Sequence, residues 1–201
     1  MITRSRLLAC FVCLATTAAF AADAPKPPEM TPEQKAMMEA FARMGEVRAE
    51  HKQLEYFAGR WNVKTSVVMD PAGPPQVTNG KSETKALFGG RSYEINYEGS
   101  YNGESFTGRG YIGFDNLKGK FFSSWMDSMS TGMWLALGTY DAKNKSYTFF
   151  GEMDDPLSPK TVLKIRQVFR IVDDKHYTFE WNETRPGGKE TKTMWIEYTR
   201  A

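Results

Sequence analysis

The sequence contains few of the side chains that thiol and metal chemistry require. Its only cysteines, Cys10 and Cys13, lie within the first 21 residues, and its only histidines are His51 and His176. No group of His, Asp and Glu residues has the spacing of a metal site. No nucleophilic triad is supported without paired histidines or a cysteine. We therefore predict no metal, no cofactor and no catalytic residue, which favours a binding protein and leaves an enzyme as an alternative.

The chain also lacks an excess of one charge. It has 26 basic and 24 acidic residues. Two of the basic residues, Arg4 and Arg6, belong to a leader that we expect to be removed, and the remainder carries 24 residues of each sign. A neutral chain has no electrostatic basis for binding nucleic acid, so we exclude that class of partner.

Long apolar runs are absent beyond the leader. The one such run, Leu7 to Phe20, follows two arginines and ends at the small-x-small sequence Ala19-Phe20-Ala21. This pattern predicts a signal peptide over residues 1–21, which is too short for a membrane anchor. We expect a periplasmic or secreted protein with no membrane span after cleavage. Because both cysteines leave with the leader, its stability must come from a packed core.

A tether and a helix are expected after the leader. Residues 22–30 contain three prolines, which indicates a disordered tether. Thr31-Pro32-Glu33-Gln34 has the residues of a helix start, with Thr as N-cap and Pro at the first position. Apolar side chains then recur at helical spacing as far as about Tyr56. We predict one amphipathic helix over residues 31–57, whose stripe includes Met37, Phe41, Met44, His51 and Leu54.

From Trp61 onward the apolar residues alternate with polar ones, which predicts strands. Ten strands are expected near residues 61–69, 81–88, 92–101, 104–114, 120–127, 132–140, 146–153, 160–172, 176–185 and 189–200. Their links are too short for crossover helices, so each strand should pair antiparallel with the next. Closure removes both edges of such a meander. We predict that residues 58–201 form an all-β domain, a closed antiparallel up-and-down barrel of about ten strands, preceded by the one N-terminal amphipathic α-helix.

The two ends of this barrel are expected to differ. Trp61 begins the first strand and Arg200 ends the last, so the two side chains should meet, with Arg200 over the indole ring as a structural plug. The longer links, at residues 70–80, 128–131 and 154–159, fall at the opposite end. We predict that this opposite end is the mouth through which a ligand enters.

Several short motifs resemble known families. Gly59-x-Trp61 with a closing Arg200 resembles the lipocalin-like superfamily of calycin-type barrels. Over residues 51–200 the chain is similar to a bacterial family known as domain of unknown function 1579. The segments that carry this similarity are His51–Leu54 with Gly59–Trp61, Gly108–Asn116, Trp125–Gly132 and Tyr198–Arg200. The resemblance implies a secreted or soluble lipocalin-like barrel and no established activity.

Site candidates cluster at the predicted mouth. The segment from Trp125 to Gly132 combines an indole, a carboxylate and hydroxyls, and we select Trp125, Asp127, Ser128 and Thr131 as ligand-binding candidates. Asp and Ser also favour turns, so these side chains have an alternative role in holding the loop backbone.

Polar residues also interrupt two apolar strand faces. Gln167 shares a face with Leu163 and Phe169, and Glu183 shares one with Trp181. A buried carboxylate without a partner is costly, so these positions must be paired, wet or near the mouth. We add Gln167, Trp181 and Glu183 to the ligand-binding candidates, with a wet lining as the alternative.

Two other motifs are assigned structural roles. Gly108, Gly110 and Gly113 spell a dinucleotide fingerprint but lie within a strand, so they are expected to make room inside a barrel. His51 lies on the apolar stripe and is expected to be satisfied against the barrel base.

Three hypotheses of function follow. The first is binding of a small apolar or amphipathic molecule in the barrel interior. The second is an isomerase-type or hydrolase-type enzyme that uses inward carboxylates such as Asp127 or Glu183, which requires two titratable groups within reach of one reacting atom. The third is a scaffold that engages an unidentified protein partner through the helix, which an exposed Met37, Phe41 and Met44 stripe would favour.

Overall fold

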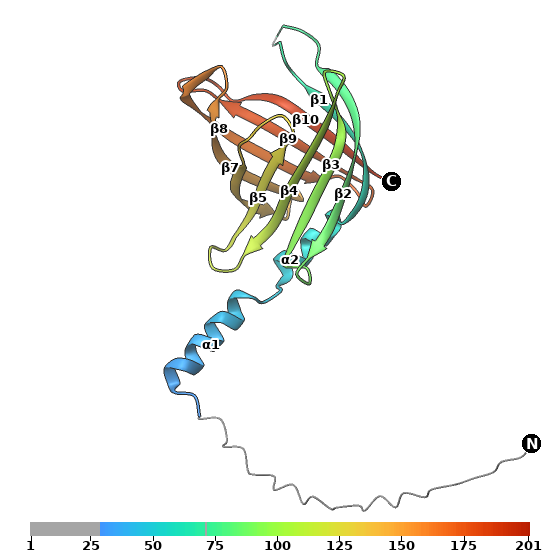
Figure 1. The fold of residues 1–201 in the computed structure, drawn as a ribbon. Coiled ribbons are helices and arrows are strands. Elements are labelled where there is room, and N and C mark those ends of the chain that lie inside the picture. Colours follow the sequence, from blue (N-terminus) through green and yellow to red (C-terminus); the bar gives the residue numbers. More distant parts are fainter. Residues whose placement is uncertain (1–28, 71) are drawn as a thin grey trace, which may run out of the picture.

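Ten antiparallel strands close into one barrel in the computed structural model, which describes residues 29–70 and 72–201. Each strand pairs with its neighbours in the chain, and β1 pairs with β10 to complete the circle (Figure 1). The strands are β1 (Gly59–Val67), β2 (Gln76–Leu87), β3 (Ser92–Tyr101), β4 (Glu104–Asp115), β5 (Lys120–Asp127), β6 (Trp134–Asp141), β7 (Ser146–Asp155), β8 (Ser158–Ile171), β9 (His176–Thr184) and β10 (Thr191–Arg200). The predicted fold is confirmed. The expected signal peptide lies outside the described residues, as does the expected tether apart from Glu29 and Met30.

Two of the expected mouth links are shorter than the sequence indicates. β2 begins at Gln76, opposite Val67 of β1, so the first link spans 68–75. The expected link at 154–159 is wrong, because β7 and β8 are joined by residues 156–157 alone. The Asp155 side chain explains this tight turn, since it accepts a hydrogen bond from the Leu157 amide at 3.0 Å. The mouth therefore depends chiefly on the links 68–75, 128–133 and 185–190.

The N-terminal helical region lies within its expected bounds but is interrupted. It comprises α1 (Pro32–Met44), α2 (Ala49–Gln53) and the 3₁₀-helix η1 (Leu54–Phe57). Thr31 caps α1 with the predicted capping box. α1 projects away from the barrel (Figure 1) and buries none of its residues. The single apolar stripe therefore separates into an exposed part on α1 and a buried part on α2 and η1.

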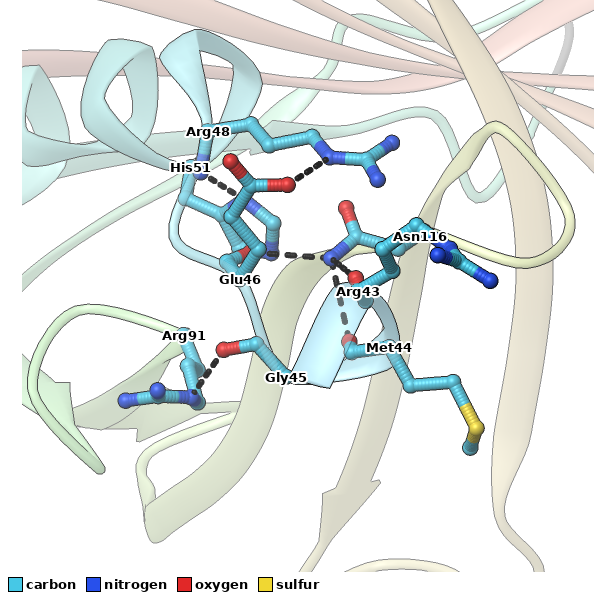
Figure 2. A network of polar contacts seen from close by, with 8 residues as sticks. All are labelled: Arg43, Met44, Gly45, Glu46, Arg48, His51, Arg91 and Asn116. Carbon is cyan, nitrogen blue, oxygen red and sulfur yellow. Dashed lines mark hydrogen bonds and ion pairs between the residues drawn. The ribbon is translucent and has the colours of Figure 1, made fainter. Parts of the chain in front are cut away.

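Two barrel side chains hold the end of α1. Asn116, in the turn between β4 and β5, donates through Nδ2 to the carbonyls of Arg43, Met44 and Glu46 at 3.2, 3.0 and 2.8 Å (Figure 2). Arg91 donates through Nε to the Gly45 carbonyl at 2.7 Å. These bonds take up carbonyls that a continued helix would have used, so the helix ends here. No helix among residues 29–70 and 72–201 is long and apolar enough to cross a membrane.

The segment α2–η1 closes one end of the barrel. His51, Leu54 and Phe57 are 3%, 0% and 2% exposed. The Phe57 ring packs edge-on against Tyr147, Phe169 and Tyr177, with centroid distances of 5.6, 6.1 and 5.0 Å. Edge-to-face contacts of this kind stabilise an aromatic core beyond the area they bury.

Trp61 and Arg200 meet as the sequence predicts. They are register partners, and the Arg200 guanidinium lies 4.1 Å from the centroid of the Trp61 ring. Its Nη1 and Nη2 donate to the carbonyls of Ala58 and Tyr56, both at 2.8 Å. Gly59 has φ +112°, and a Cβ there would lie 2.9 Å from Arg200 Nη1. The Gly-x-Trp motif therefore encodes both the turn into β1 and the seat of this arginine.

Candidate functional site

Exposure changes along the inward faces of the strands. On β5, Phe121 is buried near the closed end, and Trp125 and Asp127 are half-buried near the mouth. On β9, Tyr177 is likewise buried and Trp181 half-buried. Val67 on β1 and Ile196 on β10 are likewise half-buried beyond the buried residues of their strands, whereas Leu163, Ile165 and Gln167 on β8 remain buried in the mouth half. The mouth half of the lumen is therefore partly exposed along β1, β5, β9 and β10 and buried along β8.

Three indoles line this half of the lumen. Trp125 and Trp134 are register partners on β5 and β6. Trp134 contacts Trp181 of β9 with ring centroids 4.8 Å apart and planes inclined by 57°. The Trp134 side chain can extend to Trp181 because residue 151 of β7 is a glycine. A Cβ at Gly151 would lie 2.6 Å from Cη2 of Trp134. Gly108 of β4 leaves the corresponding space for Trp125, so the predicted spatial role of this glycine is confirmed.

Each end of this arc of indoles carries a carboxylate. Trp125 Nε1 donates to Asp127 Oδ2 at 3.0 Å, and Trp181 Nε1 donates to Glu183 Oε1 at 3.0 Å. Both pairs are two residues apart, because alternate residues of a strand share a face. Thr193 Oγ1 also donates to Glu183 Oε1, at 2.9 Å.

The loop after β5 combines the two roles that the sequence left open. Asp127 Oδ1 accepts from the amides of Met129 and Ser130 at 3.0 and 3.1 Å, which is turn chemistry. Ser128 Oγ accepts from the Thr107 amide at 3.1 Å, tying the loop to β4. Thr131 is exposed at the rim. Asp127 therefore faces both the loop and Trp125, whereas Ser128 and Thr131 belong to the rim and lie apart from the indoles.

Two buried polar atoms beside the indoles lack partners. Gln167 is 3% exposed and is the register partner of Trp181, and its Oε1 accepts no hydrogen bond within the described residues. Trp134 Nε1 is likewise without an acceptor there. Leaving such a group unpaired costs about 1–3 kcal/mol. Deeper in the lumen the hydroxyls of Ser82, Thr84 and Tyr147 likewise have no partner among residues 29–70 and 72–201.

A family profile covers the strands and the motifs that the sequence shares with a known family. The profile described as protein of unknown function (DUF1579) matches residues 46–200. The chain belongs to the DUF1579 family. This match covers all ten strands together with α2 and η1, and it excludes α1.

Some solved structures resemble the chain at low sequence identity, and one of them reaches a TM-score above 0.5. The crystal structure of Rv2717c from M. tuberculosis matches this DUF1579 barrel with a TM-score of 0.54 and 11% identity, over 78% of this chain and 99% of that chain. A redesigned beta barrel, mFAP0, bound to DFHBI, matches with a TM-score of 0.41 and 13% identity, over 72% and 99%. These likenesses concern architecture alone. No curated protein matches the chain.

The histidines of the DUF1579 barrel lie away from the mouth. His51 is buried at the closed end, where its Nδ1 accepts from the Arg48 amide at 3.1 Å. Burial lowers its pKa, and the Phe114 backbone opposes that effect. His176 lies on the outside beside Asp173. Asp127 bonds to Trp125 and to loop amides, and Glu183 bonds to Trp181 and Thr193, so the mouth groups each carboxylate with an indole.

Trp134 is the site residue that the sequence reasoning missed. The sixth strand was expected over 132–140, and alternation places Trp134 on the same face as Ala136 and Gly138. That small-residue face, together with Gly151 on the next strand, signals room for a large side chain in the lumen.

Two shallow hollows on the outer wall are weaker candidates. They measure about 410 and 430 Å³ and share Asn62, Val63 and Asn79. None of the residues lining them carries one of the unpaired buried atoms found among the described residues. The mouth of the DUF1579 barrel is therefore the better site.

Proposed function

We propose that this protein binds a small amphipathic molecule in the mouth half of the barrel lumen. The observation that carries the proposal is the pair of unpaired buried atoms, Trp134 Nε1 and Gln167 Oε1, set among aromatic side chains. Ligand sites commonly combine an apolar lining with a few polar groups that fix orientation. A donor and an acceptor that the protein leaves unused are groups of this kind.

The rest of the lumen supports an apolar ligand body. Half-buried side chains around the mouth include Ile95, Phe106, Met194 and Ile196. The closed end is filled by α2 and η1, so a ligand enters between the hairpin loops of the mouth. With the leader expected over residues 1–21, the protein would act as a carrier in the periplasm or outside the cell.

Native mass spectrometry of the purified protein, with solvent extraction of any bound molecule, tests this proposal. The expected result is a bound mass that denaturation releases. Trp134→Phe removes the unpaired N–H and should lower retention, whereas Trp195→Phe should not, because Trp195 lies on the outer wall of β10. A protein that retains nothing and takes up no added amphiphile would overturn the proposal.

A second candidate function rests on α1. Its apolar residues Met37, Met38, Phe41 and Met44 are between 45% and 58% exposed. The outer wall of β6 and β7 carries another uncovered apolar patch, made of Leu135, Leu137 and Phe150, in which Leu137 and Phe150 are register partners. We infer that α1 of one copy packs on this wall of a second copy, since one chain supplies both faces.

Sedimentation velocity of the purified protein tests this self-association. A dimer is expected for the wild-type chain, and both Phe41→Asp and Leu137→Asp should yield monomers. Val77→Asp is the matched control, because Val77 is similarly exposed on the outer face of β2. A wild-type monomer at all concentrations would overturn the inference and leave the ligand proposal intact.

A further inference from the structure

We propose that the ligand carries a protonated amine, held in the lumen by Glu183, Gln167 and the Trp134–Trp181 pair. This inference rests on the proposed function and names the chemical class of the ligand. The juxtaposition that carries it centres on Trp181, which donates to Glu183, contacts Trp134 and is the register partner of Gln167.

The charges at the mouth are unbalanced. Asp127 and Glu183 face inward, and neither forms an ion pair with another side chain in the described part of the chain. Other carboxylates nearby are paired: Glu180 on the outer face of β9 binds Lys192, and the buried Asp155 binds Arg185. That Arg185 hydrogen bond holds the pKa of Asp155 below its ordinary value. Two inward carboxylates thus remain for an external cation.

The indoles strengthen the preference of the mouth for a cationic ligand. A cation is attracted to the face of a tryptophan ring, and more strongly when the site is shielded from water. Trp125 and Trp181 each donate their N–H to a carboxylate. Donation to an anion shifts electron density into the ring, so the faces of these indoles become better partners for a positive charge.

Gln167 narrows the class to amines that retain an N–H. Its Oε1 is a buried acceptor that receives no hydrogen bond from the described part of the chain, and it lies next to Trp181 in register. A protonated amine can donate to Oε1 while its charge faces Glu183. A fully substituted ammonium has no hydrogen to donate and leaves Gln167 unpaired. Trp134 Nε1 requires an acceptor, so the ligand should also carry an oxygen near its amine.

Four probes that share a twelve-carbon chain separate the contribution of the positive charge from that of the N–H donor and from that of the apolar chain. Dodecylamine, dodecyltrimethylammonium, dodecanol and dodecanoate would each be titrated into the purified protein at neutral pH and below micelle formation. Calorimetry and tryptophan fluorescence report the binding. We expect dodecylamine to bind at least tenfold more tightly than dodecanol, dodecyltrimethylammonium to bind between them, and dodecanoate to bind most weakly.

Two variants on β9 give the matched comparison, and one on β8 tests the role of the amine N–H. Glu183→Gln should weaken dodecylamine binding about tenfold and leave dodecanol binding unchanged. Glu180→Gln removes a carboxylate from the opposite face of β9 and should change neither. Gln167→Leu should abolish the preference for dodecylamine over dodecyltrimethylammonium.

The outcomes distinguish the two proposals. Equal binding of dodecanol and dodecylamine, or tightest binding of dodecanoate, would overturn the amine inference while supporting a ligand in the lumen. An amine preference that Glu180→Gln reduces as much as Glu183→Gln would place the cation on the outer wall, which also overturns it. Absence of binding by all four probes would overturn both proposals.

Discussion

The two ends of the barrel are made by the same ten strands and differ in what covers them. At the closed end α2 and η1 seal the lumen, and Arg200 is bonded there to two carbonyls and stacked on Trp61. At the mouth none of the described helices covers the inward faces, and Trp134, Trp181 and Glu183 are half-buried. The contrast teaches that helical segments and a bonded arginine close one end, whereas the other end has half-buried indoles and a carboxylate on its inward faces.

The largest expected effect is loss of the plug. Trp61→Ala should lower the free energy of unfolding by about 3–5 kcal/mol, because it removes a fully buried side chain and leaves a cavity under Arg200. Urea denaturation measures this change. Trp134→Ala at the mouth should cost less, because that indole is half-buried and its neighbours already face solvent. Equal losses of unfolding free energy in the two variants would contradict the difference in packing between the two ends.

The next effect concerns glycines with positive φ. Gly59→Ala should destabilise the protein by about 2–4 kcal/mol, because it adds both a disfavoured φ and a Cβ that displaces Arg200. Gly103→Ala, in the β3–β4 turn of the mouth, provides the control. It also has positive φ, but nothing lies within 4 Å of its added Cβ. The difference between the two variants in denaturant unfolding isolates the contact with Arg200.

The strands and the plug were predictable from the sequence because local patterns determine them. Alternation and turn residues gave ten strands, and an up-and-down order places Trp61 beside Arg200 whatever the detailed packing. The break after Met44 was not predictable from the helical period. It depends on Asn116, a side chain about seventy residues away that binds three carbonyls at the end of α1.

The candidate site was predictable only in part, because some of its contacts also join residues that are far apart in the sequence. The Trp125–Asp127 and Trp181–Glu183 pairs follow from the two-residue period of a strand. The contact between Trp134 and Trp181 joins β6 to β9 across the lumen, and it depends on the space above Gly151. Such a contact lies outside the reach of periodicity, because it depends on how far a side chain extends from the wall.

A smaller effect is the pH dependence of the closed end. Burial lowers the pKa of His51 below its ordinary value of 6.5. The unfolded chain therefore takes up a proton more readily than the folded protein as the pH falls below about 6.5. The contribution of His51 to stability is complete above that pH and is lost on acidification. His51→Gln should flatten the fall in free energy of unfolding between pH 6.5 and 5, whereas Lys52→Gln, on the exposed face of α2, should keep the slope of the wild-type protein.

The smallest expected change in stability, at the mouth, has the opposite sign. Gln167→Leu removes a buried acceptor that has no donor and replaces it with a side chain of similar volume, so the free energy of unfolding should stay constant or rise by up to about 1 kcal/mol. A stabilised variant that no longer prefers an amine would mean that the mouth sacrifices stability for recognition, as binding sites commonly do. A loss of more than about 1 kcal/mol in thermal or urea unfolding would instead mean that Gln167 already supports the folded wall, and the division between the two ends would fail at this residue.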